Sequence, residues 1–257
     1  MMKLASPSPQ PATCTAHMSL SCWIYGSGSA WELWWVAAEG EQCEGDEGLW
    51  AAFSTIPSMT SPPPETELGL PVVVRAMRTE EFNQMRELSV SAFNGDPVIG
   101  PLLDALRSSW AWDDELSFVA DLDGDLVGHV LYTRALLDAA PRLVEVLVLS
   151  PIGVRPDLQN RGIGGRLIRE SLAVVGRRPE PLVFLEGHPG YYPRFGFERA
   201  TDLGFTAPSV RIPQDAFMVH RLPGYESWMT GTLVYPDAFW RLDAVGLRDN
   251  PPDQVTG

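Results

Sequence analysis

Cysteine is scarce in this sequence, and the few cysteines lack the spacing of a disulfide framework or a zinc site. The chain has three cysteines, with no Cys-x-x-Cys pair and only His17 near any of them. They are Cys14, Cys22 and Cys43. An odd number without such spacing provides neither a disulfide framework nor a zinc site. Because the other histidines are also scattered without ligand spacing, we predict no metal.

Long apolar runs are missing as well. No stretch of 18 or more uninterrupted apolar residues occurs, and the nearest approach, residues 18–38, is broken by several glycines and serines and by Glu32. The amino terminus carries Lys3 and a Ser-Pro-rich stretch, with no apolar run leading to a small-residue cleavage site. We therefore expect neither a transmembrane helix nor a secretory signal, and we predict a cytoplasmic protein.

Positive charge is in short supply. The 257 residues include 19 basic and 33 acidic side chains, which gives a formal net charge of -14. A field of that sign repels nucleic acid phosphates and anionic membranes, so we expect no nucleic acid and no membrane partner. A cationic or amine-bearing partner fits better. With 45% apolar and 20% charged residues, the chain has the profile of a globular protein of one or two domains.

The first 70 residues differ in composition from the rest. They hold all three cysteines, five of the nine tryptophans and a single basic residue, whereas the other 18 basic residues are arginines that come later. Ser61-Pro62-Pro63-Pro64 then forms a stiff, extended linker. We predict a tryptophan-rich extension with a Pro-rich linker over 1–70, a folded domain over 71–224 and a C-terminal tail over 225–257.

The origin of the extension stays open between two hypotheses. Residues 1–58 are either a translated upstream extension, with Met59 as the native start, or a tryptophan-rich interaction segment.

Regular patterning begins at residue 71. The β-branched run from Val72 to Met77 predicts a strand. Thr79 then offers an N-cap to a helix with an apolar stripe, and a leucine cluster around Leu103 predicts a second, shorter helix. The stripe consists of Phe82, Met85, Leu88 and Ala92 or Phe93.

A hairpin and a longer strand follow. Two strand-like runs, Leu116 to Asp121 and Leu126 to Tyr132, flank the turn signal Asp123-Gly124-Asp125. The next strand spans Leu143 to Val154 and contains Ser150-Pro151. Proline inside a strand removes a ladder hydrogen bond, so we expect a bulge there.

Glycines cluster where that strand passes into a helix. The chain runs Gln159-Asn160-Arg161-Gly162-Ile163-Gly164-Gly165-Arg166 and continues with helical apolar spacing. Glycines let backbone N–H groups approach a ligand, and the first helical turn presents unpaired donors and a positive dipole end. A pyrophosphate suits such a site, and an ordinary capping turn is the alternative. The Walker pattern is absent, and Leu167 replaces the third glycine of the dinucleotide fingerprint.

The stretch from Val154 to Gly164 resembles the acetyl-coenzyme A signature of the GNAT N-acetyltransferases, whose core is Gln/Arg-x-x-Gly-x-Gly/Ala after a bulged strand. A predicted strand, Pro181 to Glu186, precedes Gly190-Tyr191-Tyr192-Pro193-Arg194-Phe195-Gly196-Phe197, which is similar to the second cofactor region of the family. The resemblance covers roughly residues 72–222 and points to the small bacterial branch with a Tyr-Tyr-Pro-Arg-Phe-Gly-Phe segment.

The resemblance implies an α/β (α+β) fold: a mixed, mostly antiparallel central sheet, flanked by helices and splayed at the bulged strand. It also implies acetyl-CoA as cosubstrate, with pantetheine inserted at the splay against the backbone of Ile152 and Val154. The remaining positions that match the cofactor site are Gln159, Asn160, Arg161, Gly162, Gly164, Gly165 and Arg166.

One catalytic role follows from the same resemblance, and a second is required by the chemistry of an amine acceptor. Tyr192 matches the general acid that protonates the leaving thiolate, with Tyr191 as the alternative donor, and a phenol of pKa about 10 holds its proton at neutral pH. An attacking amine must first lose a proton. Glu145 and Glu186, both in apolar runs, are the candidate bases, because burial would raise the pKa of either. Two alternatives stay open: one or both glutamates point toward solvent, or water removes the proton from the amine without a single base.

The function that we predict is transfer of acetyl from acetyl-CoA to a primary amine of an unidentified small-molecule or peptide acceptor, by direct attack in a ternary complex. Two alternatives stay open: a catalytically silent acyl-CoA-binding module, and an interaction protein that works through its tryptophan-rich segment. The assembly that we keep open is a homodimer.

Overall fold

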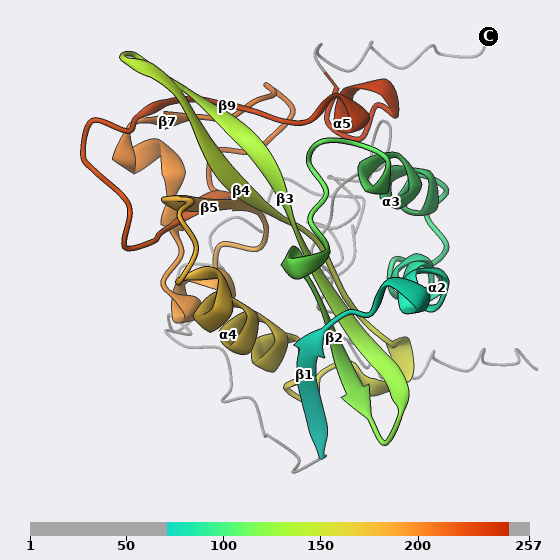
Figure 1. Cartoon of the computed structure of the whole chain (residues 1–257). Helices are drawn as coiled ribbons and strands as arrows, with labels where there is room; N and C mark the ends of the chain where they lie inside the picture. The colour runs from blue at the N-terminus through green and yellow to red at the C-terminus, as the bar shows by residue number, and fades with distance from the viewer. Residues whose placement is uncertain (1–70, 247–257) are drawn as a thin grey trace, which may run out of the picture.

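The computed structural model of the chain describes residues 71–246, and Figure 1 shows how its elements are arranged. The predicted extension and linker over 1–70 lie outside the described residues. So does the end of the predicted tail, from residue 247 onward.

A nine-stranded sheet organises the described residues. Its order is β1-β2-β3-β4-β5-β8-β6, and β9 pairs with both β3 and β7. The strands are β1 (Val72–Ala76), β2 (Ser117–Leu122), β3 (Asp125–Ala139), β4 (Arg142–Val154), β5 (Leu182–Glu186), β6 (Glu198–Arg199), β7 (Phe205–Thr206), β8 (Phe217–Arg221) and β9 (Gly231–Val234). The β4–β5 and β7–β9 pairs are parallel and the others are antiparallel. The sheet is therefore mixed and mostly antiparallel, as predicted.

Helices cover both faces of this sheet. They are α2 (Phe82–Ala92), α3 (Ile99–Arg107), α4 (Ile163–Val175) and α5 (Asp237–Arg241). Figure 1 shows α4 on one face, with α2, α3 and α5 on the other. Each face buries an apolar cluster of its own, because side chains alternate along every strand. None of the helices within residues 71–246 is long and apolar enough to span a bilayer.

The start of α2 differs from the prediction. Thr79 opens a short 3-10 turn, and Glu81 occupies the N-cap position of α2. The Glu81 carboxylate accepts a hydrogen bond from the Arg78 backbone N–H at 2.8 Å and pairs with Arg75 at 2.7 Å. The hydrogen bond from Arg75 is the main cause that lowers the pKa of Glu81 to about 2. This ion pair links β1 to the start of α2, whose N-cap residue makes no side-chain capping hydrogen bond to the helix.

The predicted hairpin and bulge are both present. Asp123 and Gly124 adopt positive φ angles of 53° and 95° and close the β2–β3 hairpin. Farther along, Tyr132 pairs with Leu149 and Val130 with Ile152, so Ser150 and Pro151 stand opposite the single residue Leu131. Two residues against one is a β-bulge, which bends the strand at that point.

Part of the predicted C-terminal tail belongs to the folded unit. β9 pairs with Leu136–Ala139 of β3, along the edge that β2 leaves after Leu131. Tyr235, Ala238 and Phe239 then lie buried in the cluster on the α2 side. The sequence expectation of a tail is corrected up to residue 246, because a four-residue strand and a five-residue helix are too short to show a period.

Candidate active site

The strands β4 and β5 part soon after they meet. They pair only through Leu147 with Val183 and Val148 with Phe184. Beyond that point β4 continues through the bulge to Val154, and β5 continues to Glu186. Parallel strands whose ladder stops after two pairs leave backbone donors and acceptors facing each other across an opening. The splay that the family resemblance implies at the bulged strand is therefore present.

The backbone of β4 beyond the bulge is oriented toward this opening. The N–H of Arg155 donates to the Val127 carbonyl, near the start of β3, at 2.9 Å, on the β3 side of β4. Since alternate residues of a strand bond to the same neighbour, Ile152 and Val154 direct their backbone groups to the opposite side. The side-chain amide of Gln159 donates to the Val154 carbonyl at 3.1 Å, which is consistent with that direction.

The glycine-rich loop turns sharply at the end of β4. Asn160 and Gly162 adopt left-handed φ angles of 61° and 82°, and α4 begins directly afterwards at Ile163. The first backbone bond of the helix runs from the Arg166 N–H to the Gly162 carbonyl at 3.0 Å. The N–H groups of the first turn therefore have no partner within the helix, which is the arrangement that binds anions.

Gly164 and Gly165 lie in that first turn, and the turn sits close to other parts of the opening. A Cβ on Gly164 would lie 3.5 Å from the hydroxyl of Tyr191 and 3.8 Å from the Val154 side chain. The start of α4, the end of β4 and the Tyr191 phenol thus meet at one place.

Two arginines flank the loop in different ways. Arg161 is exposed, whereas Arg166 is half-buried and its Nε contacts the Glu170 carboxylate at 2.6 Å, one helical turn away. An arginine that is already paired with a carboxylate has fewer guanidinium N–H groups, and less uncompensated charge, with which to bind a phosphate. Arg161 is therefore the stronger candidate for a charge-assisted phosphate contact.

Tyr191 and Tyr192 pack on each other but contact different elements around the opening. Tyr192 is 3% exposed, and its ring packs so closely on Gly187, the residue after β5, that a Cβ there would collide with it. The ring of Tyr191 stands edge-on to that of Tyr192, with centroids 5.1 Å apart, and its hydroxyl lies at the start of α4. Tyr192 is thus the tyrosine beside the end of β5.

Glu186 is the last residue of β5 and is 4% exposed. The Tyr235 hydroxyl donates to its Oε1 at 2.7 Å. Burial raises the pKa of Glu186 to about 7, and the hydrogen bond from Tyr235 lowers it in part. A carboxylate with a pKa near 7 suits a general base at neutral pH. Two residues earlier, Phe184 belongs to the α2-side cluster, so alternation puts Glu186 on that face.

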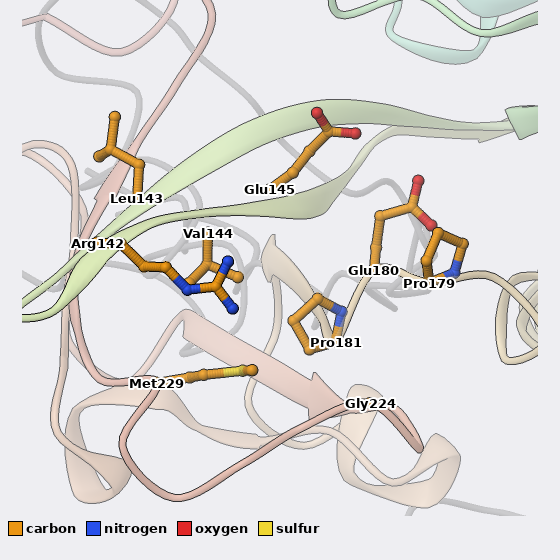
Figure 2. Close-up of a pocket in the computed structure, with 9 residues that line it drawn as sticks. All are labelled: Arg142, Leu143, Val144, Glu145, Pro179, Glu180, Pro181, Gly224 and Met229. Atoms are coloured by element: carbon orange, nitrogen blue, oxygen red, sulfur yellow. The ribbon is translucent and has the colours of Figure 1, made fainter.

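Glu145, the other candidate base, lies elsewhere. Its side chain is 52% exposed and contacts the Arg134 guanidinium at 3.3 Å. It is one of the residues that line a hollow of about 240 Å³ at the start of β4 and β5, and in Figure 2 its side chain points away from Arg142. Five residues of strand, roughly 16 Å, separate Glu145 from Ser150 at the bulge. The structure therefore does not bring Glu145 to the opening where Glu186 lies.

Sequence reasoning missed two polar residues at this place. Tyr235 lies 49 residues from Glu186 in the chain, and no local pattern signals the contact. Ser150 sits in the bulge with its side chain buried, and its hydroxyl has no hydrogen-bond partner among residues 71–246. In the same part of the chain, no group of three or more His, Cys, Asp or Glu side chains is placed to hold a metal ion.

Comparison with known proteins agrees with this geometry. Residues 73–200 match the model of the acetyltransferase (GNAT) domain. The uncharacterized N-acetyltransferase YjhQ of Escherichia coli K12 is 34% identical over 161 residues, which span 61% of this chain and 88% of YjhQ. The chain belongs to the GNAT acetyltransferase family. The loop before α4 and the segment from Gly190 to Phe197 are the parts of this GNAT chain that carried the sequence resemblance.

Solved structures support the fold of this GNAT acetyltransferase. A GNAT acetyltransferase from Brucella melitensis, solved with acetyl-CoA, is 28% identical with a TM-score of 0.53, covering 66% of this chain and 99% of its own. The YhbS protein of Escherichia coli, solved with CoA, is 24% identical with a TM-score of 0.59, covering 66% and 92%. The GNAT fold predicted from the sequence is confirmed.

Proposed function

We propose that this GNAT enzyme transfers the acetyl group of acetyl-CoA to a primary amine of a small-molecule or peptide acceptor by direct attack in a ternary complex. The observation that carries the proposal is the parting of β4 and β5 after Val148, with the start of α4 at one end of the opening and Glu186 at the other. The two related structures solved with acetyl-CoA or CoA support this choice of cosubstrate.

The residues around the opening fit acetyl-CoA. The backbone groups of Ile152 and Val154 suit the amides of pantetheine, since both offer hydrogen bonds along an extended edge. The donors of the first turn of α4, with those of the preceding loop, suit the pyrophosphate. This set comprises Asn160, Arg161, Gly162, Gly164 and Gly165, with Gln159 holding the Val154 carbonyl and Arg166 beside the first turn.

In this reaction Glu186 acts as the general base and Tyr192 as the general acid. The acceptor ammonium gives a proton to Glu186, directly or through water, and its nitrogen then attacks the thioester carbonyl carbon. A C–N bond forms and the C–S bond breaks, and Tyr192 donates its phenolic proton to the departing sulfur. The attacking nitrogen then loses its second proton, which passes through water to the Tyr192 phenolate, and Glu186 releases the first proton to solvent. Glu186 lies on the α2 side of the sheet, and the Tyr192 ring packs in the cluster on the α4 side. Base and acid thus stand on opposite faces of the opening.

The choice of Tyr192 over Tyr191 rests on position. Tyr192 packs at the end of β5, one residue beyond Glu186, whereas the Tyr191 hydroxyl lies beside Gly164 at the phosphate end. We therefore assign the general acid to Tyr192 and a place along the cosubstrate to Tyr191.

A panel of amines, assayed by release of the CoA thiol, tests the function. Tyr192→Phe keeps the ring packing and removes the proton donor, so turnover should fall about 100-fold while acetyl-CoA affinity stays near that of the parent. The matched variant Tyr191→Phe should lose much less. Equal losses in the two variants would contradict the assignment, and thermal stabilisation by acetyl-CoA without turnover on any amine would favour the silent binding module.

Assembly and location stay predictions. The homodimer that the sequence leaves open is tested by light scattering of the full chain, and the predicted cytoplasmic location by fractionation of cells that produce it.

A further inference from the structure

We propose that Tyr235 is a positioning residue for Glu186, so that the segment after β8 completes the proton-accepting part of the site. Residues 225–246 lie beyond the 73–200 range that matches the family model, so the family resemblance assigns no role to them. The proposal rests on the proposed function, in which Glu186 accepts the proton of the amine.

The contact itself is short and protected from water. The Tyr235 hydroxyl and the Glu186 Oε1 are 2.7 Å apart, and the two residues are 3% and 4% exposed. An O–H donor to an ionised oxygen at this distance makes a charge-assisted hydrogen bond, stronger than one between neutral groups. Its strength increases further where water is excluded, because the local dielectric is low.

The backbone delivers Tyr235 to this position in a defined way. The ladder between β9 and β3 ends at Val234, one residue before Tyr235. On the other side, the Tyr235 carbonyl accepts a hydrogen bond from the indole N–H of Trp240 at 3.1 Å, and its ring packs on Phe239 with centroids 4.8 Å apart. Strand pairing, an indole hydrogen bond and ring packing therefore fix the phenol before any ligand binds.

The hydrogen bond favours the ionised form of the carboxylate. Burial alone raises the pKa of Glu186, and the Tyr235 hydroxyl opposes this effect. Because a donor stabilises the charged form, its removal raises the pKa further above its ordinary value. Glu186 would then stay protonated at a neutral pH at which it has to accept a proton.

Other titratable groups on the surrounding elements have partners elsewhere. The His188 ring accepts from the Gly190 N–H at 3.1 Å. Others are His220 on β8, bonded to the Gly196 carbonyl, Asp237 and Arg241 on α5, bonded to each other, Glu145 on β4, bonded to Arg134, and Arg221 on β8, bonded to Glu198. Burial and the Tyr235 hydroxyl are the causes that act on the pKa of Glu186.

The first experiment compares Tyr235→Phe with Tyr132→Phe in the full chain. Tyr132 is a matched control, because its hydroxyl also makes a buried 2.7 Å hydrogen bond, to Ser171 of α4. We expect the acid limb of the kcat/KM profile of Tyr235→Phe to move up by about one pH unit, which is a tenfold loss below pH 6, with acetyl-CoA affinity unchanged. The profile of Tyr132→Phe should stay in place.

A direct titration separates this proposal from the proposed function. Infrared difference spectra, assigned with Glu186→Gln, follow the protonation of the Glu186 carboxyl without any turnover. A raised pKa in Tyr235→Phe together with a shifted rate profile supports both ideas. A raised pKa with an unshifted rate profile keeps the positioning role and overturns Glu186 as the base. An unchanged pKa overturns the positioning role.

A second variant covers the case in which Tyr235→Phe does not fold. Replacement of Tyr235 by 3-fluorotyrosine keeps the ring and its hydroxyl but strengthens the donor. The acid limb should then move to lower pH, opposite in sign to the effect of phenylalanine. A fluorinated enzyme whose titration and rate profile match those of the parent would overturn the proposal.

Discussion

The buried carboxylate of Glu186 should cost the protein stability at alkaline pH, and Glu186→Gln should remove that cost. In the folded chain burial raises the pKa of Glu186 from 4.5 to about 7. Below pH 4.5 the folded and unfolded chains both hold the proton. As the pH rises, the unfolded chain releases it first, so stability declines until the folded chain releases it too, at about pH 7.

The size of the effect follows from the two pKa values. A pKa difference of one unit corresponds to about 1.4 kcal/mol, so the step from 4.5 to about 7 corresponds to roughly 3 kcal/mol of unfolding free energy. Most of this falls between pH 5 and pH 9. Glutamine has the same shape, still accepts from Tyr235 and does not titrate, so its stability curve lacks this decline.

Urea unfolding at a series of pH values measures the difference. We expect the free energy of unfolding of Glu186→Gln, relative to the parent, to improve by 2 to 3 kcal/mol, roughly, from pH 5 to pH 9. The same variant should lose turnover. Glu145→Gln is the matched control on the exposed part of β4, and its curve should follow that of the parent. Parallel curves for the parent and Glu186→Gln would refute the reasoning.

Three further predictions concern other parts of the molecule. Gly162→Val places a branched Cβ at a left-handed φ of 82°, so acetyl-CoA binding measured by calorimetry should weaken at least tenfold, roughly, and undiminished binding in a folded variant would contradict the loop assignment. A chain that begins at Met59 should keep binding and turnover, because β1 to α5 lie after residue 71, and failure to fold would count against the proposed division of the chain. Burial lowers the pKa of His129 to about 3, so the parent should lose stability as the pH falls below about 6.5, whereas His129→Gln should lose less. Urea midpoints measured at pH 4 and pH 7 test this, and a difference between the two pH values that is the same for His129→Gln as for the control His220→Gln would argue against it.

Strong local patterns made much of the fold predictable. The apolar stripe around Met85 predicts α2, the Asp123-Gly124 turn predicts the β2–β3 hairpin, and Pro151 predicts the bulge in β4. The elements β6, β7, β9 and α5 escaped prediction, because two to five residues repeat a strand or helix pattern too few times for it to be recognised. β9 is an example, because its place in the sheet depends on β3, almost 100 residues earlier.

The site could be predicted only in part for related reasons. Gly162 and Gly164 mark the loop, because glycine at a passage from strand to helix has a local geometric meaning. The sequence could not show whether Glu145 or Glu186 is the better candidate for the general base. Alternation along a strand does not tell which of its faces or stretches is buried under other elements. The partner of Glu186 could not be found at all, because a contact over 49 residues leaves no local trace.

Tyr235 and the glycine-rich loop come from different segments of the chain, so each segment can change between relatives without the other. The loop lies within the stretch that matches the family model, whereas Tyr235 comes from residues beyond it. Substitutions around Tyr235 would therefore change the working pH range of the enzyme while leaving the phosphate contacts untouched. In a set of relatives, we expect the pH optimum to follow the C-terminal segment, and affinity for the acyl donor to follow the loop before α4.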